Sequence, residues 1–463
     1  MSDLWKDEVR EGGLLREEQQ DHLLPNQEQQ SSKLRINASR LQSNIRELAI
    51  FGLNQATGGL DRTTFTPAEL AAREWLKAEL LRLNLAVRVD AAANIWAVRS
   101  GAGGRSPDVS AVSDRSVACL AAIAFGSHID TVPNGGKYDG ALGVLLALEV
   151  MTVLEENKVV TRHPLELVSF SAEEPNPFGL STFGSRAVAG KLKAKDLAGV
   201  RNDQGELLTE ALRLAGGDPE QFEAARRKPE ELAAFLEVHI EQGKRLLDRD
   251  IPVGLVTAIT GIYREEITVL GEANHAGTTL MGDRKDALMG ASEMLLAFET
   301  VCRNHPADEV VGTIGRISNE PNAANIIPEK VTFHLEIRGE QRAQIREVLG
   351  DWGKLALPIA ERRGLRLERR LILDQSPEPL DSLVISLCEG QAEKLGYSSL
   401  RLGSMAGHDA THMASLTRAG MLFVPSLDGK SHCPEEESRI EDMEKAGNVL
   451  LQSILALDQE LNH

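Results

Sequence analysis

The sequence predicts an α/β protein in which a mostly parallel sheet covered by helices forms a catalytic domain, interrupted by a smaller α+β domain. Apolar strands alternate with helical segments up to about residue 250. The order then changes to strand–helix–strand–strand–helix–strand, which is a complete small domain. A chain of 463 residues also exceeds the length at which one hydrophobic core stops growing, so two domains are expected.

The first elements are marked by local signals. Residues 1–34 are rich in Glu, Gln and Asp, which predicts a polar N-terminal extension. Thr66-Pro67-Ala68-Glu69 combines an N-cap, a Pro at the first helical position and a capping-box Glu, so a helix should begin there. The sequence LAVRVDAAANIWAVRS alternates like paired strands. The Gly-, Ser- and Asp-rich residues 100–118 are expected to form a surface loop.

The segments CLAAIAFGSHID and PLELVSFSAEE are predicted to be buried strands that run into loops, with GALGVLLALEVMTVLEE as the helix between them. The six-element βαββαβ pattern, which is ferredoxin-like, falls between Ile251 and Leu373. We therefore expect a catalytic domain formed by residues 35–250 and 374–463, interrupted by an inserted domain formed by residues 251–373.

Composition excludes several classes of function. The chain has 51 basic and 69 acidic residues, a net charge of −18, which argues against nucleic-acid and anionic-membrane partners. Its four cysteines are too scattered for a disulfide framework or a CxxC metal site, and reduced thiols in a cytoplasm are the simplest interpretation. No segment resembles a signal peptide or a membrane span.

Polar residues follow both buried strands. His128 ends the first strand and Asp139 precedes the next helix, at a position where open α/β sheets bind ligands. The second strand ends in Glu173-Glu174; one carboxylate could bind a metal ion while the other faces a water whose pKa that ion lowers. Taken singly, the His and Asp could form a structural hydrogen bond, and the two glutamates could simply be solvated.

Two later segments add to this set. LEVHIEQG supplies His239, Glu241 and Gln242, of which His239 or Glu241 could face the same cavity. DGKSHCPEEES presents His432 in a loop bounded by Pro and Gly. Together these residues predict a site for two divalent ions with a spare glutamate as base. The ligand types suit zinc, manganese, cobalt or nickel equally.

Seven segments then resemble a known family in order along the chain. The sequence is similar to the hydantoinase/carbamoylase branch of the aminoacylase-like metallopeptidase superfamily, which includes N-carbamoyl-L-amino acid hydrolases, allantoate amidohydrolases and β-ureidopropionases. The matching segments are GSHIDTVPNGGKYDG, the EE followed by FG and GSRA, LEVHIEQG, NHAGTTLMGDRKDAL, PNAANIIPEKVTFHLEIR, GHDA and SHCPEEES.

The resemblance implies a role for each residue at the site. Asp139 would bridge two ions, Glu173 would act as general base and acid, and the other metal ligands would be His128, His239, Glu174 and His432. His275 would help polarise the substrate carbonyl, often in the partner subunit's site. Asn325 and Arg338 would clamp the substrate carboxylate, and Gln242 would be a further substrate contact. His408 and Asp409 also match, without an assigned step; orienting a ligand is the expected role.

One departure concerns specificity. The family commonly follows its Glu pair with Gly-Ser-Arg-Phe, whereas Pro175-Asn176-Pro177-Phe178 stands here, which stiffens the loop and removes two backbone donors. The loop at residues 100–118 also looks longer than usual. Both features weaken an assignment to allantoate specifically.

Three functional hypotheses follow. The leading one is metal-dependent hydrolysis of the carbamoyl C–N bond of N-carbamoyl-L-amino acids or close ureido acids by a cytoplasmic enzyme. The resemblance further implies a homodimer in which the inserted domain serves as the lid and dimerisation domain. The second keeps the chemistry and changes the substrate to allantoate, ureidoglycolate-type compounds, N-acyl-amino acids or dipeptides. The third is a catalytically silent binding or scaffold protein, which the complete set of ligands disfavours. No phosphate-binding GxxxxGK[ST] loop or serine-hydrolase elbow competes with these readings.

Overall fold

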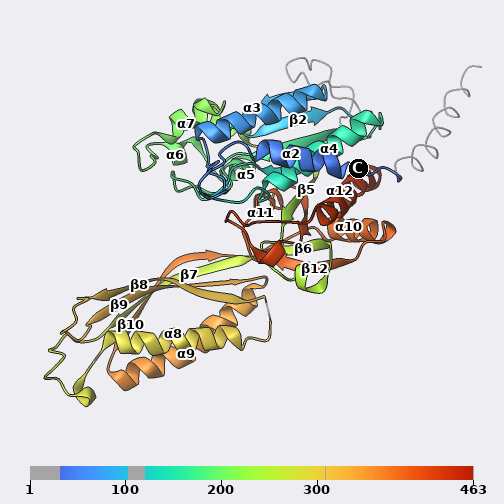
Figure 1. Ribbon diagram of the computed structural model, residues 1–463. Coiled ribbons are helices and arrows are strands. Elements are labelled where there is room, and N and C mark those ends of the chain that lie inside the picture. Colours follow the sequence, from blue (N-terminus) through green and yellow to red (C-terminus); the bar gives the residue numbers. More distant parts are fainter. Residues whose placement is uncertain (1–31, 103–119, 308, 462–463) are drawn as a thin grey trace, which may run out of the picture.

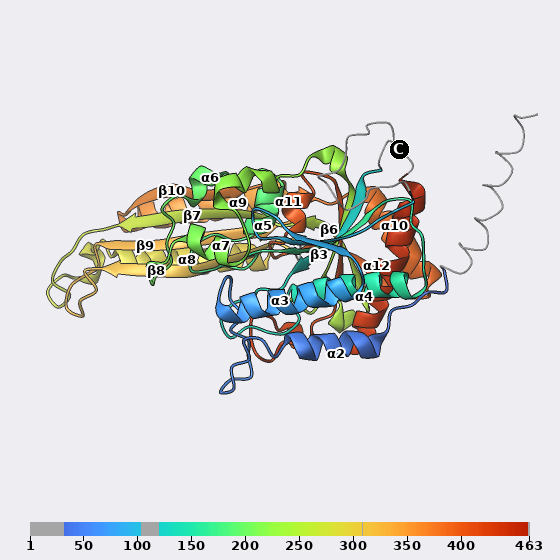
Figure 2. The same cartoon turned by 90° about the horizontal axis from the view of Figure 1, so that it is seen from above.

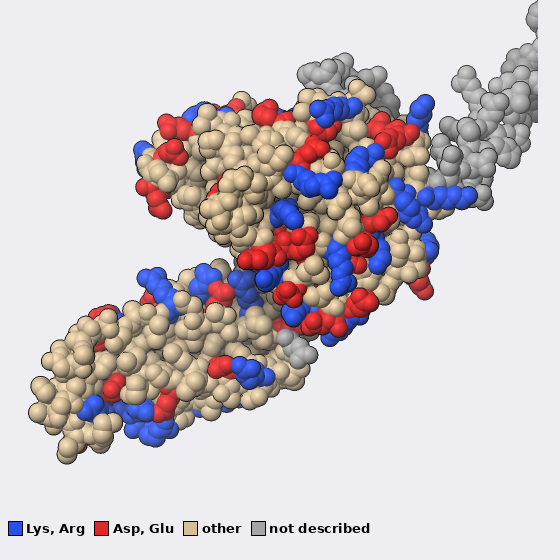
Figure 3. Space-filling model, viewed as in Figure 1, with Lys and Arg blue, Asp and Glu red and all other residues tan. Residues whose placement is uncertain are grey.

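The computed structural model describes residues 32–102, 120–307 and 309–461 (Figure 1). Most of the predicted N-terminal extension and of the 100–118 loop lies outside these residues. The chain forms a main body with a nine-stranded sheet and a smaller body with a four-stranded sheet. The smaller body projects away from the main one, and the surface is hollowed between them (Figures 1 and 3).

The main body is built from two stretches of chain. The first contains α2 (Ala38–Leu48), α3 (Pro67–Arg82), β1 (Ala86–Val89), β2 (Ile95–Arg99), β3 (Ala122–His128), α4 (Ala141–Glu156), β4 (Leu165–Phe170), α5 (Phe183–Val188), α6 (Ala194–Leu197), α7 (Leu208–Leu214), β5 (Leu232–Ile240) and β6 (Val253–Ile259). The second contains β11 (Glu378–Pro379), α10 (Ser382–Lys394), β12 (Ser399–Ser404), α11 (Ala410–Met413), β13 (Arg418–Val424) and α12 (Ile440–Glu460).

Short 3₁₀ helices occupy several connections: η1 (Pro219–Ala225), η2 (Pro229–Glu231), η3 (Leu247–Arg249), η4 (Met281–Asp283) and η5 (Leu427–Gly429).

The predicted helix start is confirmed, because α3 begins at Pro67 and the Thr66 side chain accepts a hydrogen bond from the Glu69 backbone N–H. The Glu69 carboxylate accepts from the N–H of Phe65, one residue before the cap.

The large sheet has the strand order β1-β2-β4-β3-β5-β13-β6-β11, with β12 paired to β6. Its centre is parallel, because β4, β3, β5 and β13 are parallel neighbours, and β12 is parallel to β6. The outer pairs β1–β2 and β2–β4, and the pairs of β6 with β13 and β11, are antiparallel. The main sheet is therefore mixed, with the predicted parallel arrangement at its core.

Helix α4 explains why its sequence is apolar on all sides. It packs on β3, β4 and β5 and also contacts α2 and α12, so every residue from Ala141 to Leu154 is buried. A helix that is hydrophobic all round belongs inside a protein. Figure 2 shows α2, α3 and α4 together along one side of the main body.

The smaller body follows the predicted order: β7 (Gly261–Leu270), α8 (Ala287–Arg303), β8 (Val311–Glu320), β9 (Lys330–Gly339), α9 (Arg342–Arg363) and β10 (Arg366–Gln375). Its antiparallel strands lie in the order β10-β7-β9-β8. Helices α8 and α9 pack together and against the strands, and Phe333 and Trp352 are among the buried residues between them. The two bodies thus have separate hydrophobic cores.

The smaller body begins after β6 and not at residue 251, where the sequence predicted the insertion to start. Strand β6 pairs with β13, β12 and β11 of the large sheet, and only Thr260 separates it from β7. An almost continuous extended segment therefore passes from one sheet to the other, and no turn residue marks the crossing.

Strand direction fixes which end of the smaller body faces the main one. Gly261 pairs with Gly339 beside the main body, and Leu270 pairs with Lys330 at the far end. Nine residue steps at about 3.3 Å each separate these ends by about 30 Å. Groups at opposite ends of this sheet cannot meet around one small molecule.

Candidate metal centre

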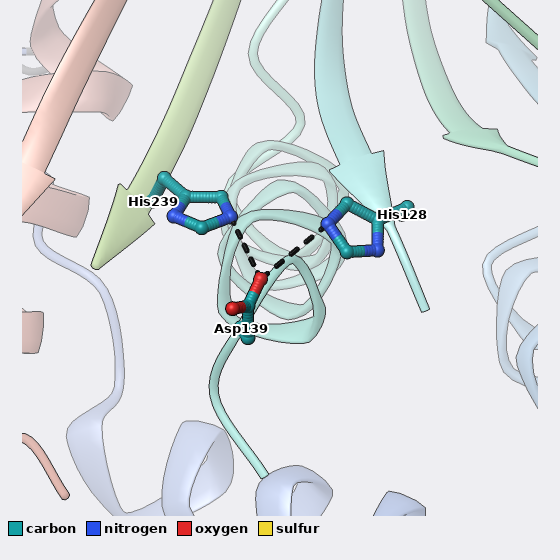
Figure 4. Close-up of side chains that lie close together, drawn as sticks. All are labelled: His128, Asp139 and His239. Carbon is teal, nitrogen blue, oxygen red and sulfur yellow. Dashed lines mark ion pairs between the residues drawn. The ribbon is translucent and has the colours of Figure 1, made fainter. Parts of the chain in front are cut away.

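Three side chains from distant parts of the chain converge at the carboxyl ends of the central strands (Figure 4). His128 ends β3, His239 lies near the end of β5, and Asp139 directly precedes the turn into α4. The Asp139 Oδ1 atom lies 3.1 Å from His239 Nε2 and 3.6 Å from His128 Nε2. All three residues are buried.

A second group uses the other oxygen of the same carboxylate. The Asp139 Oδ2 atom lies 3.1 Å from His432 Nε2, and Glu174 Oε1 lies 3.3 Å from that nitrogen. Within each group of three, the potential ligand atoms lie within 4.8 Å of one another. Asp139 belongs to both groups, as a carboxylate that bridges two ions would.

Backbone geometry at the site depends on residues that accept unusual conformations. Gly140 has a φ of 62°, and a Cβ there would lie 2.2 Å from His128 Nε2, so only glycine fits between Asp139 and α4. Ala172, Gln242 and His432 also have positive φ. Such strain in residues other than glycine gathers at functional sites, where the surrounding structure must hold it.

The histidine rings are oriented by backbone carbonyls. His128 Nδ1 donates to the Asp130 carbonyl at 3.1 Å, and His239 Nδ1 donates to the Ile240 carbonyl at 3.0 Å. A carbonyl oxygen only accepts, so the proton sits on Nδ1 and the lone pair of Nε2 points at Asp139. The Gly140 N–H donates to His239 Nε2, which requires the same tautomer. This arrangement is typical of metal-binding imidazoles.

The electrostatics match a site built for cations. Burial alone would raise the pKa of Asp139, but the His239, His432 and His128 imidazoles outweigh burial and hold this pKa well below its ordinary value. Hydrogen bonds to Asp139 and Glu174 raise the pKa of His432 to about 11. The His432 imidazole thus carries positive charge that a bound ion would otherwise supply.

The two glutamates after β4 take different positions. Their backbone N–H groups both donate to the Asp130 carboxylate, at 3.3 Å from Glu173 and 3.2 Å from Glu174. Glu174 faces His432, whereas Glu173 Oε2 lies 3.7 Å from His128 Nε2 at the edge of the first group. Burial, and then the carboxylates of Glu174 and Asp409, raise the pKa of Glu173 well above its ordinary value against the opposing effect of His128.

The donor set fits two divalent ions. Imidazole nitrogens and carboxylate oxygens are borderline ligands that suit zinc, manganese, cobalt or nickel. The buried Glu174 Oε1 has no partner among the described residues other than the His432 imidazole, as expected of an oxygen that shares a cation with that ring. Glu241 does not join the set, because its carboxylate accepts hydrogen bonds from Arg245 and from the Leu246 N–H.

The predicted substrate contacts and the predicted catalytic His275 lie in three places. Gln242 lies at the metal groups, where its Nε2 donates to Asp139 Oδ2 at 2.8 Å. Arg338 lies at the near end of the smaller body, where its Nη1 donates to the Met405 carbonyl of the main body at 3.0 Å. His275 and Asn325 lie beyond the far end of the same sheet, linked by a hydrogen bond from the Ala276 N–H to the Asn325 carbonyl.

Within one chain, the structure therefore brings the five predicted metal ligands, Glu173 and Gln242 together, and it leaves His275 and Asn325 apart. Both of these residues are exposed. Ile262 pairs with Arg338, and Leu270 pairs with Lys330, eight residue steps further along β7. His275 and Asn325 lie beyond that second pair, so they are more than about 25 Å from Arg338 along the strands.

Three further buried residues support the site: Asp130, for which the sequence predicted no role, and His408 and Asp409, which were expected to orient a ligand. The Asp130 carboxylate holds the glutamate pair, and the buried ring of His408 packs at 4.5 Å from that of His239. Asp409 is also buried and accepts a hydrogen bond from Ser185. Their motifs, GSHID and GHDA, were visible in the sequence, but only the fold shows which ligand each one supports.

Comparison with known proteins agrees with this geometry. Residues 124–456 match Peptidase family M20/M25/M40. The chain belongs to this family. It is 36% identical over 427 residues to an N-carbamoyl-L-amino acid amidohydrolase of Geobacillus stearothermophilus, covering 92% of this chain and 99% of that protein. It is 35% identical to an allantoate amidohydrolase of Bacillus subtilis, covering 86% and 93%.

A solved structure of a carbamoylase-type amidase has the same fold as this M20 family member. The hydantoinase/carbamoylase family amidase of Burkholderia multivorans superimposes with a TM-score of 0.82 at 30% identity, covering 92% of this chain and 99% of that one. The predicted resemblance to the carbamoylase branch is thus confirmed. Among the described residues, no helix combines the length and the apolar character that crossing a bilayer demands.

Proposed function

We propose that this chain hydrolyses the ureido C–N bond of N-carbamoyl-L-amino acids or close ureido acids. The observation that carries the proposal is the pair of His/carboxylate groups sharing Asp139, with Glu173 left over beside them. Relatedness over nearly the whole chain to an N-carbamoyl-L-amino acid amidohydrolase supports the choice of substrate.

The metal ligands would hold two divalent ions, whose identity the ligand types leave open. His128 and His239 would complete one ion's protein ligands, Glu174 and His432 the other's, and Asp139 would serve both. When bound, such ions lower the pKa of water and stabilise negative charge on oxygen.

The chain's own residues would carry the proton. Glu173 is buried beside His128, and its raised pKa suits a carboxylate that takes a proton from water and delivers it to the leaving nitrogen. Arg338 and Asn325 would hold the substrate carboxylate, and His275 would stabilise the developing oxyanion. The products would be the amino acid, carbon dioxide and ammonia.

A second candidate keeps this chemistry with allantoate or a related ureido compound as substrate, and the Bacillus subtilis relative supports it. The loop after Glu174 weakens the assignment to allantoate. Pro175 and Pro177 cannot donate backbone hydrogen bonds, and the Asn176 side chain donates to the Glu174 carbonyl at 3.2 Å and so is engaged within the loop. Kinetics against N-carbamoyl-amino acids, allantoate, N-acyl-amino acids and dipeptides, with each metal restored, would rank them.

We infer a homodimer formed through the smaller body, which would act as a lid and place His275 and Asn325 at the partner's metal site. We infer a cytoplasmic location from the cysteines, because those in the described residues (Cys302, Cys388 and Cys433) are free.

The decisive experiment is Glu173→Gln. The amide keeps the shape of the side chain and cannot take the proton, so we expect turnover to fall roughly 100- to 10,000-fold while metal analysis still finds two ions. Glu435→Gln, at an exposed glutamate of the His432 loop, is the matched control and should retain full activity. Near-normal turnover in metal-replete Glu173→Gln protein would remove Glu173 from this role.

A further inference from the structure

One carboxylate joins the loops that carry two of the three members of the second group, Asp139 and His432. Glu436 Oε1 accepts hydrogen bonds from the backbone N–H groups of Tyr138 at 2.8 Å and Asp139 at 3.0 Å. Its other oxygen lies 3.0 Å from Ser431 Oγ. Glu436 therefore touches the backbone of the bridging aspartate and the residue that precedes His432.

Ser431 extends this link to the metal-facing oxygen. Its hydroxyl also lies 2.9 Å from Asp139 Oδ2, the oxygen that faces His432. Gln242 Nε2 donates to the same oxygen and lies 3.1 Å from Ser431 Oγ. The Asp139 side chain is thus held through Ser431 and Gln242, and its backbone is held through Glu436.

The fold leaves room for this contact at a specific place. Glu436 is 2% exposed, although it stands in a run of three glutamates. At Gly136, a Cβ atom would lie 2.1 Å from the Glu436 carboxylate, so a larger residue would push that group away. The φ of Gly136 is not in the left-handed region, so the need for glycine comes from this contact and not from backbone strain.

We propose that Glu436 is a positioning residue that sets the distance between Asp139 and His432 and so determines the affinity for the divalent ions. The inference rests on the two-metal site of the proposed function. Groups that orient metal ligands contribute about 10- to 100-fold to metal affinity. Glu436 touches no ligand atom itself and acts through the Tyr138–Asp139 backbone and Ser431.

The neighbouring Glu437 provides a matched control. Its carboxylate pairs with the Lys137 ammonium at 3.1 Å and accepts a hydrogen bond from the Tyr138 hydroxyl, so it binds the same two loops. It makes no contact with Asp139 or Ser431 among the described residues and is half-exposed. A loss of general loop stability would appear in Glu437 variants as well.

The experiment compares Glu436→Ala, Glu437→Ala and Glu436→Gln by calorimetric titration of zinc and of manganese into metal-free protein. We expect Glu436→Ala to weaken binding about 10- to 100-fold and Glu437→Ala to stay within about threefold of the wild type. Glu436→Gln keeps an acceptor for both N–H groups and an amide toward Ser431, so it should restore affinity to within about threefold. Thermal unfolding of the metal-free proteins checks that each variant folds.

Gly136→Ala supplies an independent route to the same defect, because it displaces the carboxylate without removing it; we expect a similar loss of affinity. In assays at saturating metal, Glu436→Ala and Gly136→Ala should regain most of the wild-type kcat, and the KM for the substrate should change little. Wild-type affinity in folded Glu436→Ala protein, or an equal loss in Glu437→Ala, would overturn the inference. Failure of the wild type to bind two ions would instead overturn the proposed function.

Discussion

The two bodies of this protein contribute to the site in different ways. In the main body, the candidate ligands form two groups of three that share Asp139. Within each group the ligand atoms lie within 4.8 Å of one another, and backbone carbonyls orient His128 and His239. In the smaller body, His275 and Asn325 lie exposed beyond one end of a sheet and Arg338 lies at the other end. The candidate metal-binding groups therefore come together within one chain, whereas the residues predicted to bind the substrate do not.

This difference follows from how each region is built. The candidate metal ligands lie at or just beyond the carboxyl ends of adjacent parallel strands, which one hydrophobic core fixes relative to each other. The smaller body has its own core and is joined through the chain crossings at β6–β7 and β10–β11. A rigid sheet of about 30 Å cannot fold His275 back toward Arg338, so a second copy of the chain is the simplest source of the missing group.

The strongest test of this comparison is subunit complementation. We expect His275→Ala to lower turnover about 100- to 1,000-fold and Glu173→Gln to be similarly impaired. If His275 serves the partner's metal centre, mixed dimers contain one site with both residues intact. Equal mixing of the two variants with subunit exchange should then restore about a quarter of wild-type activity, because half of the dimers are mixed and half of their sites are complete.

The control mixes Glu173→Gln with Asp139→Ala, two variants that both damage the main body's own site. No mixed dimer of this pair contains an intact metal centre with Glu173, so activity should stay at the level of the single variants. If the His275→Ala and Glu173→Gln mixture also fails to recover although subunits exchange, His275 acts within its own chain and the comparison of the two bodies breaks down.

The same contrast explains what the sequence could predict. The placement of His128 and of Glu173-Glu174 at strand ends could be predicted, because an apolar run followed by polar residues marks the end of a buried strand. Their proximity could be predicted as well, because parallel strands bring their carboxyl ends together. The order of strands and helices in the smaller body could also be predicted from its hydrophobic pattern. The crossing at Thr260 could not, since β6 and β7 form nearly one extended run. The roles of Glu436 and Asp130 depend on contacts between distant loops, which no local pattern encodes.

A smaller effect is expected at Arg338, the substrate residue of the smaller body that already reaches the main one. Its Nε donates to Glu336 at 2.9 Å and one Nη1 hydrogen to Met405, which leaves the Nη2 side for a carboxylate. Arg338→Lys removes paired hydrogen bonds worth about 1.5–3 kcal/mol, so KM should rise roughly 10- to 100-fold with metal content unchanged. The uncharged amide of the substrate should be affected far less; an equal loss for acid and amide would exclude a carboxylate clamp.

The smallest effect concerns protons released when the ions bind, and it should arise from the main body alone. The raised pKa of His432, about 11, means that this imidazole is protonated near neutrality in the metal-free protein. A metal ligand must be neutral, so binding displaces that proton, and affinity should rise about tenfold per pH unit for each proton released, between pH 6 and 9. Titrations in buffers of different ionisation enthalpy count these protons. His432→Asn should lower the count by one, whereas His275→Ala, at the far end of the smaller body, should leave it unchanged; a change with His275→Ala would place that residue at its own chain's ions.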